Sequence, residues 1–298
     1  MKILVIGSKG FIGSHCVDYF SKNNEVWGCD VILDYNRTNY FFIESVDSNF
    51  NEIFLKNKFD VCINCSGAAS VPFSLEKPLN DFNLNTLNVC KILDGIRQFN
   101  PECKYINMSS AAVYGNPEKI PIMESDRMVP VSPYGFHKVM AENICKEYSR
   151  FWGVKTCCLR IFSAYGPGLR KQIFWDMYHK FITQDNIELW GTGRESRDFV
   201  YISDIIKIIE LAIYKSSFDG QSVNVANGEQ ITIAHVAMAF VKELNSLKKI
   251  SFNNSVRKGD PLNWQADIKI IQSWGYNKSI SLEQGIKKYI SWIEKESK

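Results

Sequence analysis

The sequence predicts an α/β protein with a doubly wound parallel sheet and a smaller C-terminal α/β lobe. Two observations predict this fold. Short apolar runs alternate with longer helical stretches in the first half, an order typical of parallel sheets with helices on both faces. The first apolar run, which ends at Ile6, also leads directly into a glycine-rich turn that opens a helical stretch.

The elements of the sheet are expected in the order of this alternation. The apolar runs predict the strands Ile3–Ile6, Glu25–Cys29, Val61–Asn64, Lys104–Met108 and Val154–Ile161. The stretches between them predict the helices Gly13–Asn23, Ser48–Lys56, Asp81–Phe99 and Tyr134–Phe151.

The second half is less regular and predicts the smaller lobe. Its expected elements are a helix around Phe174–Thr183, a strand leading into a helix over Arg197–Tyr214, and the helices Thr232–Leu244 and Ser281–Glu296. We expect this lobe to pack on the carboxyl edge of the sheet, where ligands bind in such folds.

Composition and charge narrow the possible function classes. The 298 residues are 45% hydrophobic and 22% charged, an ordinary globular composition for one large or two modest domains. The formal net charge of +3 is small and the basic residues form no run, so we expect neither a nucleic-acid nor a membrane partner. The first apolar stretch is too short for a signal peptide or a membrane span, and we expect a cytoplasmic protein.

The nine cysteines predict neither a metal site nor a redox site. Most of them lie in apolar runs, where a small hydrophobe serves, so we expect reduced thiols. Cys62 and Cys65 have CxxC spacing, but alternation along a strand places them on opposite faces. No second CxxC or histidine pair completes a zinc site.

The segment Gly7-Ser8-Lys9-Gly10-Phe11-Ile12-Gly13 predicts a dinucleotide site of the Rossmann type. The first glycine permits a tight turn, the second lets backbone approach a pyrophosphate, and the third lets the helix pack closely on the strand. The helix N-terminus, at Phe11 and Ile12, favours the phosphate charge.

Further candidates for this site follow the next two strands. Asp30, 17 residues after Gly13, favours NAD over NADP, because a carboxylate there accepts hydrogen bonds from the adenosine ribose and repels a 2′-phosphate. A solvated aspartate at a strand end is the alternative. The small residues Ser66, Gly67 and Ala68 allow a cofactor to approach the backbone, although they also suit an ordinary turn. Asn83 lies in the following helix, where capping or solvation is the alternative to a cofactor contact.

Tyr134 and Lys138 are candidates for general acid–base chemistry. They are four residues apart, so they share one face of the predicted helix. A phenol has a pKa of about 10 and is a poor base at neutral pH. We expect the lysine ammonium, together with a cationic cofactor ring, to lower the pKa of this tyrosine. The spacing alone also occurs on ordinary amphipathic helices, and it is the neighbouring motifs that give it weight.

Several motifs occur in a fixed order: GxxGxxG, the small-residue turn, and those that begin at Ser109 (Ser-Ser-x-x-Val-Tyr-Gly), Ser132 (Ser-Pro-Tyr-x-x-x-Lys) and Arg160 (Arg-x-Phe-x-x-Tyr-Gly-Pro). The motifs Gly191-x-Gly193-x-x-x-Arg197-Asp198-Phe199-Val200-Tyr201 and Arg257-x-Gly259-Asp260 follow. Together they resemble the extended short-chain dehydrogenases that act on nucleotide-sugars, the NAD-dependent epimerase/dehydratase family that includes enzymes like UDP-glucose 4-epimerase. The resemblance runs essentially from end to end. It implies a nucleotide-diphosphate sugar as substrate.

The resemblance also implies roles for the catalytic candidates. Tyr134 is the acid/base that exchanges a proton with a sugar hydroxyl, usually that on C4, and Lys138 binds the nicotinamide ribose. Ser110 hydrogen-bonds the reacting oxygen, and the alternative for this serine is a hydroxyl that caps local backbone.

On the substrate side, Arg197 and Arg257 match arginines that hold the diphosphate, a task that suits a bidentate and permanently charged guanidinium. An ion pair with Asp198 is the alternative for Arg197. Ser74 and Trp190 are further substrate-side candidates.

Two departures from the family pattern bear on the reaction. Family dehydratases usually carry an Asp-Glu pair after the catalytic serine or threonine, where this chain has Ala111 and Ala112. Alanine transfers no proton, so we expect no dehydration. Ser163 stands where many relatives have a substrate-binding asparagine, which leaves the sugar undetermined. His137 replaces a residue that is usually small, and we expect it on the helix surface without an acidic partner.

The resemblance therefore predicts an NAD-dependent 4-epimerase. A 4-ketosugar reductase, a nucleotide-sugar 4-dehydrogenase and a non-catalytic dinucleotide sensor are the alternatives. We expect a dinucleotide-binding domain at residues 1–165, to which the chain returns at about 197–225, and a mainly substrate-binding lobe at 166–298. The helices Asp81–Phe99 and Tyr134–Phe151 match those that pair relatives into homodimers, although their apolar faces also suit burial within one subunit.

Overall fold

The computed structural model describes residues 1–44, 48–244, 246–255, 259 and 261–296. The predicted α/β fold is confirmed, because a seven-stranded sheet with only parallel neighbours forms the centre of the molecule. In their order across the sheet, the strands are β11 (Asp219–Val225), β6 (Thr156–Ile161), β5 (Lys104–Ser110), β4 (Val61–Asn64), β1 (Lys2–Ile6), β2 (Glu25–Asp30) and β3 (Tyr40–Phe42).

The sheet is doubly wound, and its order reverses beside β1. The chain runs outward from β1 through β2 to β3, and then returns to the other side of β1 as β4. All four residues of β4 and all six of β6 are buried, as expected for strands covered on both faces. The carboxyl ends of β1 and β4 flank the switch point, where ligands bind in such sheets.

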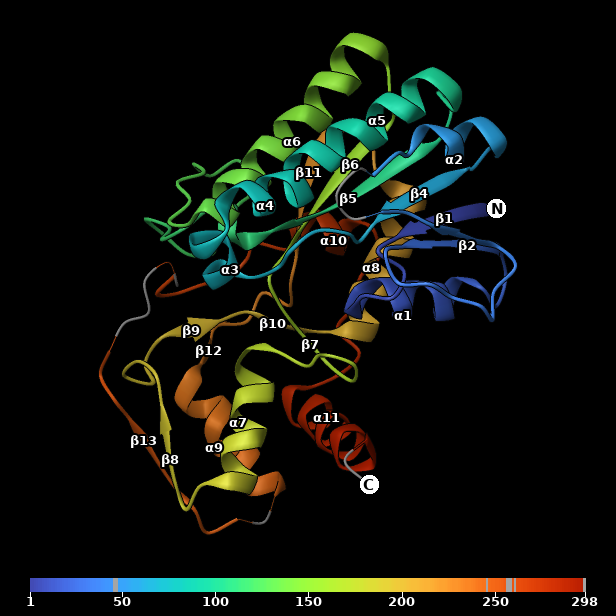
Figure 1. Ribbon diagram of the computed structural model, residues 1–298. Coiled ribbons are helices and arrows are strands. Elements are labelled where there is room, and N and C mark those ends of the chain that lie inside the picture. Colours follow the sequence, from blue (N-terminus) through green and yellow to red (C-terminus); the bar gives the residue numbers. More distant parts are fainter. Residues whose placement is uncertain (45–47, 245, 256–258, 260, 297–298) are drawn as a thin grey trace.

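Helices cover both faces of the sheet (Figure 1). On one face α2 (Asn51–Lys56), α5 (Asn88–Phe99) and α6 (Pro133–Trp152) pack side by side. On the other face α1 (Phe11–Phe20) packs against α8 (Ile202–Lys215), and the short α10 (Lys269–Ser273) packs against β11. The chain thus contributes α8, β11 and α10 to the sheet unit after it has entered the lobe.

The structure differs from the expected single helix over residues 81–99. This stretch is divided into α4 (Pro78–Phe82), the π-helical turn η1 (Asn83–Leu87) and α5, and α4 follows the short helix α3 (Val71–Glu76). The wider π-turn rotates the side chains that follow it, which changes the residues that face the sheet. The short edge strand β3 was not expected from the sequence, because its three residues are all partly exposed.

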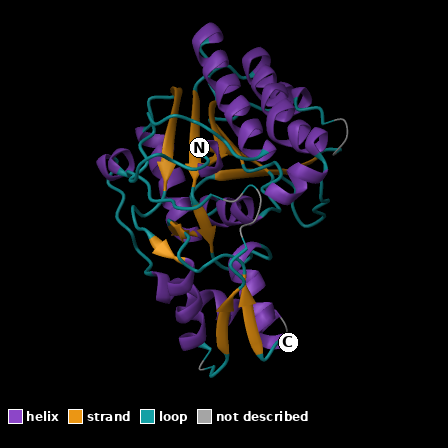
Figure 2. Cartoon of the chain, turned by 90° about the vertical axis from the view of Figure 1, so that its left-hand side faces the viewer, coloured by secondary structure: helices purple, strands orange, loops and turns teal. Residues whose placement is uncertain are grey.

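The smaller lobe lies beyond the carboxyl edge of the sheet (Figure 2). It contains three helices and the parallel pair formed by β8 and β13. Two further pairs, the parallel β7–β10 and the antiparallel β9–β12, connect it with the sheet unit. The bounds are α7 (Gln172–Thr183), α9 (Ile233–Glu243), α11 (Leu282–Glu296), β8 (Asn186–Leu189), β13 (Lys249–Phe252), β7 (Ser163–Tyr165), β10 (Phe199–Tyr201), β9 (Ser196–Arg197) and β12 (Ile231–Thr232).

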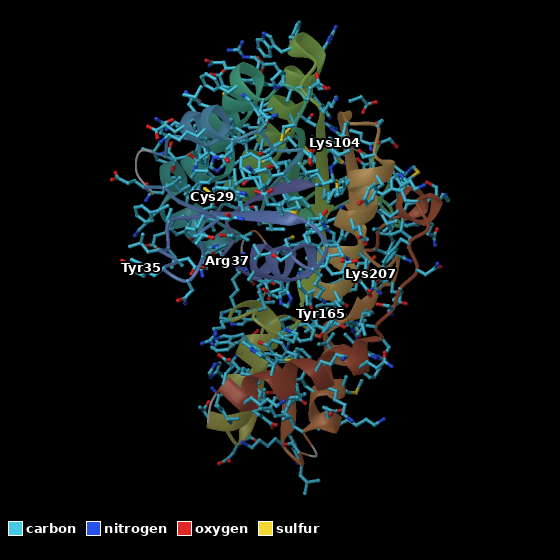
Figure 3. All side chains as sticks on the ribbon, turned by 90° about the vertical axis from the view of Figure 1, so that its right-hand side faces the viewer. Cys29, Tyr35, Arg37, Lys104, Tyr165 and Lys207 are labelled. Atoms are coloured by element: carbon cyan, nitrogen blue, oxygen red, sulfur yellow. The ribbon has the colours of Figure 1, made fainter. Side chains whose placement is uncertain are left out.

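Tyr165 lies where the sheet unit meets the lobe (Figure 3). Its ring stacks on Phe174 of α7, with ring centroids 4.5 Å apart. A Cβ atom at Gly285 of α11 would lie 2.3 Å from the Tyr165 hydroxyl oxygen, so only glycine lets α11 approach so closely. The Tyr-Gly-Pro motif therefore has a structural role at this junction.

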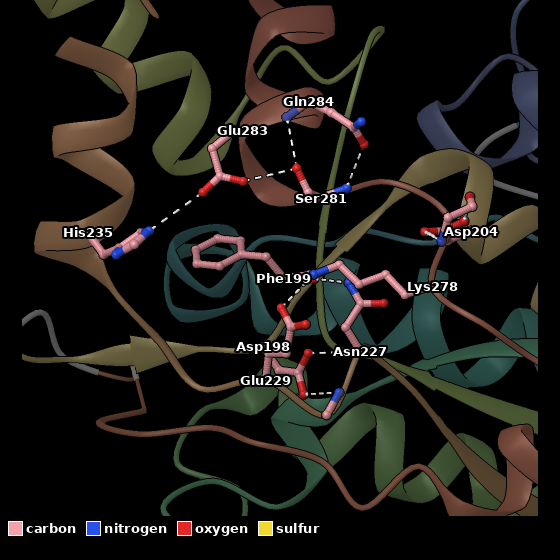
Figure 4. A network of polar contacts seen from close by, with 12 residues as sticks. Asp198, Phe199, Asp204, Asn227, Glu229, His235, Lys278, Ser281, Glu283 and Gln284 are labelled. Carbon is pink, nitrogen blue, oxygen red and sulfur yellow. Dashed lines mark hydrogen bonds and ion pairs between the residues drawn. The ribbon is translucent and has the colours of Figure 1, made fainter. Parts of the chain in front are cut away.

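Asp198 ties a second part of the junction together (Figure 4). Its carboxylate is fully buried and accepts hydrogen bonds from the backbone N–H groups of Asn227, Gly228 and Ala266 at 2.9–3.1 Å. Burial raises the pKa of Asp198 to about 7, although these hydrogen bonds act in the opposite direction. The loop after β11 is thereby fixed to the segment between β9 and β10.

The nine cysteines are free thiols, and Cys62 and Cys65 face opposite sides of β4 as expected. The described residues hold no group of three or more histidine, cysteine or acidic side chains that suits a metal ion. Within the same residues, every helix is too short or too polar to cross a lipid bilayer.

Candidate active site

The glycine turn after β1 has the geometry that a dinucleotide requires. Gly7 has a φ of +77°, and a Cβ atom there would lie 2.6 Å from the backbone nitrogen of Ser66. A Cβ at Gly13 would lie 2.0 Å from the carbonyl oxygen of Gly7, so α1 packs against the turn only because this residue is glycine. These contacts give the first and third glycines a steric reason.

Gly10 leaves the N-terminus of α1 bare. It is the N-cap residue, no side chain caps the helix, and the nearest neighbour of an added Cβ would be Gly7 O at 3.2 Å. The first N–H groups of a helix have no partner within the helix. Bare backbone and a helix N-terminus, which begins at Phe11 and Ile12, fit the pyrophosphate of NAD.

Asp30 lies at the end of β2, directly beside the glycine turn. Its side-chain oxygens accept hydrogen bonds from the backbone N–H groups of Lys9 at 2.8 Å and Ile32 at 3.3 Å. Each carboxylate oxygen keeps a second lone pair, which fits a ribose hydroxyl. Asp34 forms ion pairs with Lys9 and with Arg37, so both cations of this loop already have an acidic partner.

The turn after β4 faces a residue that the sequence had not suggested. Gly67 has a φ of +112°, and the Asn85 side chain donates to the carbonyl oxygen of Ala68 at 3.0 Å. Asn85 is 1% exposed, and among the described residues its Oδ1 has no hydrogen-bond partner. A Cβ on Gly67 would lie 2.5 Å from this oxygen. A buried acceptor beside a bare turn fits a hydrogen-bond donor from a cofactor.

Asn83, the residue proposed from the sequence, lies in the same π-turn and is partly exposed. It stays a prediction, whereas the turn directs Asn85 toward the small-residue segment. The sequence feature that could have pointed to Asn85 is its position four residues after Asp81. This spacing brings the two side chains together, and the Asn85 amide donates a hydrogen bond to Asp81 at 3.1 Å. In the same segment Ser66 donates to Asn64 Oδ1 at 2.6 Å, which holds the end of β4 in place.

Tyr134 lies in the first turn of α6. Ser132 caps this helix by accepting a hydrogen bond from Gly135 N at 3.2 Å, and Pro133 occupies the first helical position. A Cβ at Gly135 would lie 2.6 Å from the carbonyl oxygen of Ala112, so glycine brings α6 close to the end of β5. This contact places Tyr134 beside Ser110, the last residue of β5.

Ser110 has two roles in the structure. Its oxygen accepts a hydrogen bond from Ala112 N at 3.2 Å and so caps η2 (Ala111–Val113). This is the backbone-capping role that the sequence left open as the alternative. Burial is the largest influence on the pKa of Tyr134 and raises it, and hydrogen bonding with Ser110 opposes this shift, so the hydroxyl reaches the phenol. Capping and catalysis are therefore compatible at this residue.

The lysine of the pair is buried beneath the tyrosine. Lys138 is 5% exposed, donates to Met108 O at 2.8 Å, and lies 5.8 Å from the centre of the Tyr134 ring. Burial lowers the pKa of Lys138 to about 8, and the charge of Asp81 acts in the opposite direction. The ammonium of Lys138 is thus directed to a backbone carbonyl of β5.

The pKa of Tyr134 is shifted in the opposite direction to the lowering that the sequence predicted. Burial raises the pKa of Tyr134 to about 12, Ser110 opposes this shift, and the negative charge of Asp81 adds to it. The expected lowering by Lys138 is not found in the protein alone, where loss of solvent around the phenol is the largest effect.

A buried network fastens α6 to the sheet. Glu142, fully buried, accepts from Arg160 of β6 through Nη2 at 2.7 Å and Nε at 2.9 Å, and from Ser109 at 2.6 Å. Burial acts to raise the pKa of Glu142, but Arg160 outweighs it and holds the pKa below its usual value. Arg160 also donates to the Tyr114 hydroxyl at 2.6 Å. Arg160 and Tyr114, both taken from recognised motifs, are therefore scaffold residues.

The expectation that His137 lacks an acidic partner is wrong. His137 Nδ1 lies 2.6 Å from Oδ2 of Asp81, a fully buried carboxylate on α4. The imidazole also makes an edge contact with the Phe82 ring, whose centroid is 5.5 Å away. The partner was missed because it is 56 residues away in the sequence and because the histidine side chain is only 12% exposed.

The substrate-side candidates lie on several elements. Ser74 is buried and donates to Val71 O at 2.7 Å, so its hydroxyl is engaged within α3. Ser163 opens β7 and is half-buried, and Trp190 is 47% exposed directly after β8. Arg197 donates to Ser196 O at 2.9 Å and lies over the Trp264 ring at 5.5 Å.

Arg257 lies outside the described residues, but Gly259 of the same motif is described. A Cβ atom at Gly259 would lie 2.8 Å from Val71 Cγ1 and 3.5 Å from Ser132 Cβ. This glycine therefore lies against the starts of both α3 and the catalytic helix.

Known proteins resemble this chain over most of its length. A model of the NAD dependent epimerase/dehydratase family matches residues 3–226. The chain is 28% identical over 303 residues to a putative UDP-glucose 4-epimerase of Methanocaldococcus jannaschii, covering 98% of both chains. It is 32% identical over 314 residues to an uncharacterized protein of the same organism, covering 98% of this chain and 95% of the relative.

Solved structures give a similar result. UDP-glucuronic acid 4-epimerase from Bacillus cereus, in complex with UDP-glucuronic acid and NAD, matches with a TM-score of 0.89 and 25% identity over 99% of both chains. UDP-glucose 4-epimerase from Thermotoga maritima, with UDP-glucose, also matches with a TM-score of 0.89 and 25% identity, over 100% of both chains.

Proposed function

Because the chain belongs to the NAD-dependent epimerase/dehydratase family, we propose that it is a nucleotide-sugar 4-epimerase that keeps its NAD tightly bound. The observation that supports this most is the cluster of Tyr134, Lys138 and Ser110, in which the buried Tyr134 and Lys138 of α6 meet Ser110 at the end of β5. The putative UDP-glucose 4-epimerase and the two solved 4-epimerases are enzymes of the same reaction class.

NAD is the cofactor of this family, and the residues of the site fit it. The bare backbone at Gly10 and the start of α1 would hold the pyrophosphate, and Asp30 would accept from the adenosine ribose. Ser66, Gly67 and Ala68 would lie against the cofactor, with Asn85 behind them. When bound, NAD⁺ supplies a positively charged ring that takes a hydride from C4 of the sugar and returns it to the other face.

The protein residues move and hold the proton in this reaction. Tyr134 Oη takes the proton of the C4 hydroxyl and later returns it, while Ser110 donates a hydrogen bond to the same sugar oxygen. Lys138 would bind the nicotinamide ribose from beneath Tyr134. Because the pKa of Tyr134 is about 12 in the protein alone, a positive charge beside the phenol is needed to make it an effective base near neutral pH.

Dehydration is disfavoured at this site. Ala111 and Ala112 follow Ser110 directly, and neither side chain can donate or accept a proton. Epimerisation needs only one acid/base group, because the proton that Tyr134 removes is the proton that it returns. The pair of alanines therefore supports a reaction without loss of water.

We propose a nucleoside diphosphate sugar as substrate, with UDP-sugars as the first choice. Arg197, which lies over Trp264, is suited to the diphosphate because a guanidinium is always charged and binds oxygens in pairs. The 4-epimerases named above act on UDP-glucose or UDP-glucuronic acid. Ser163, shorter than asparagine, and the exposed Trp190 would shape the sugar and base subsites.

We also propose a cytoplasmic homodimer that serves polysaccharide biosynthesis. Phe136 and Met140, four residues apart on α6, are 52% and 43% exposed, and Leu87, the last residue of η1 before α5, is 38% exposed. Apolar side chains that share the outer face of two packed helices are suited to a second copy of the same face. Light scattering measures the molar mass of the wild-type protein and of the Phe136→Glu variant. We expect a dimer for the wild type and a monomer for the variant, because the substitution places a charge on the apolar face.

The test of the proposed activity is incubation with UDP-, GDP- and dTDP-sugars, with the product configuration read by NMR. Conversion of one sugar into its C4 epimer without added NAD(H), and its loss in Tyr134→Phe, is the expected result. A reaction that depends on added NAD(P)H, or that releases a ketosugar, would instead identify a reductase or a dehydrogenase. Bound NAD without any conversion would identify a sensor.

A further inference from the structure

Asp81 and His137 form a buried pair that the proposed reaction does not use. The Asp81 carboxylate is fully buried, and its Oδ2 lies 2.6 Å from His137 Nδ1. Its other oxygen accepts from the Asn85 side chain at 3.1 Å. Burying a carboxylate away from solvent costs free energy unless the charge is paired. A buried aspartate at this position therefore indicates a role other than keeping the surface soluble.

The pair connects two parts of the active site. His137 lies on α6 between Tyr134 and Lys138, and Asp81 lies on α4. From Asp81 the hydrogen bonds continue through Asn85 to Ala68 O, in the turn at the end of β4. A second bond, from Thr86 Oγ1 to His137 O at 3.0 Å, joins α6 to the π-helical turn η1 that follows α4. A chain of short polar contacts thus runs from α6 to the turn after β4.

The charge of Asp81 also acts on both catalytic residues. For Tyr134, burial is the largest influence and raises the pKa, Ser110 opposes it, and the charge of Asp81 adds to the rise. For Lys138, burial is the largest influence and lowers the pKa, and the charge of Asp81 opposes it. The other groups that act on Lys138 are Glu142 and Cys145 of α6 and Cys158 of β6. Among the described residues, Asp81 is the one charged group whose effect reaches both Tyr134 and Lys138.

Solvent has access to the histidine of the pair. His137 borders an open groove along the start of α6 that is also lined by Pro130, Val131, Ser132, Pro133 and Phe136.

We propose that Asp81 and His137 are positioning residues for the proposed 4-epimerase reaction, which hold the Tyr134–Lys138 face of α6 at a fixed distance from the turn after β4. The kinetic test of this inference rests on the proposed function. A second test, the affinity for NAD, does not depend on the sugar reaction. Positioning matters because small displacements of reacting groups have large effects on rate.

The experiment compares four full-length variants with the wild-type protein. His137→Ala removes the partner, and His137→Asn keeps a hydrogen-bond donor near the place of Nδ1 without a charge. Asp81→Asn removes the buried charge. Asp94→Asn is the matched control, because Asp94 pairs with Arg97 at 2.8 Å on α5 and is not among the groups that act on Tyr134 or Lys138.

For each variant, NAD affinity is measured by calorimetry on NAD-depleted protein, and kcat, KM and their pH dependence are measured with the sugar that the wild type converts. We expect His137→Ala to lower kcat by about 10- to 100-fold with little change in KM, and to weaken NAD binding. His137→Asn should recover most of both losses. Asp81→Asn should move the rising limb of the kcat–pH profile to lower pH, because the charge that raises the pKa of Tyr134 is gone.

Two results would overturn the inference. One is kinetics and NAD affinity for His137→Ala that match those of Asp94→Asn. The other is a combination of two observations, which would indicate a purely structural pair. In it, Asp81→Asn loses activity without a shift of the kcat–pH profile, and His137→Asn is as impaired as His137→Ala. If the wild type converts no sugar, the proposed function fails, while the NAD affinities of the variants still decide whether the pair acts on the turn after β4.

Discussion

The Glu142 carboxylate and the Arg160 guanidinium form a bidentate ion pair beneath the catalytic helix, with N–O distances of 2.7 and 2.9 Å. Both side chains are at most 2% exposed. Ser109 and Ser222 donate to the same carboxylate, so the remaining lone pairs are satisfied. This pair joins α6 to β6 and β5, and it thereby fixes the register of Tyr134 relative to Ser110.

Glu142→Gln should destabilise the protein strongly. The change leaves the Arg160 charge buried without a counter-charge, a situation that costs about 3–5 kcal/mol when one partner of a buried pair is removed. Denaturant unfolding measures the change in the free energy of unfolding. Glu52→Gln, which breaks the exposed Glu52–Lys56 pair on α2, is the control and should cost about 0.5 kcal/mol or less. Equal effects of the two substitutions would contradict the scaffold role of the buried pair.

Tyr134→Phe should abolish turnover without removing NAD. The phenol oxygen is the only part of the side chain that is lost, and a general acid–base group contributes about 10²- to 10⁴-fold to a rate. The ring keeps its place over Lys138, so the fold and the cofactor site should be unchanged. Turnover and bound NAD, measured on the same preparation, check this. A phenylalanine variant with wild-type turnover would exclude Tyr134 as the acid/base.

Gly10→Ala and Gly13→Ala should fail in different ways. A Cβ atom at Gly13 would lie 2.0 Å from Gly7 O, so this variant should lose stability as well as NAD. At Gly10 the φ of −74° suits alanine and the nearest protein atom is at 3.2 Å, so the fold should survive while NAD binding weakens. Thermal unfolding and calorimetry with NAD separate the two outcomes. Normal NAD affinity in Gly10→Ala would mean that the pyrophosphate does not lie against this residue.

Lys138 should make the protein more stable as the pH rises from about 8 toward 10.5. Its pKa is about 8 in the folded protein, against 10.5 for a free lysine, because burial disfavours the charged form. Between these values the unfolded chain binds more protons, so the free energy of unfolding increases with pH. Denaturant unfolding across this range should show a smaller increase in Lys138→Met. Identical pH dependence in the two proteins would contradict the burial of a charged lysine.

Much of the fold could be predicted because local patterns and topology agree. The buried strands, the glycine turn and the capped start of α6 depend on spacings that are visible in the chain. The division of residues 81–99 could not be predicted, since a π-turn arises from the packing of Asn85 and not from local preference.

The site shows the same limit. Tyr134, Lys138 and Ser110 were expected together, and the structure brings them together. The direction of the tyrosine pKa shift was not predictable, because burial depends on the whole tertiary structure. The Asp81–His137 pair was missed for a related reason, since no sequence spacing links residues that meet only when α4 packs on α6.

The most direct test of the account is the fate of a deuterium label placed at C4 of the converted nucleotide-sugar. The purified protein, with only its copurified NAD, should give the C4 epimer with the deuterium still at C4, because the hydride leaves and returns within one active site. NMR of the product shows both the configuration and the label. Loss of the label, release of a 4-ketosugar, or a requirement for added NAD(P)H would contradict the assignment as a 4-epimerase.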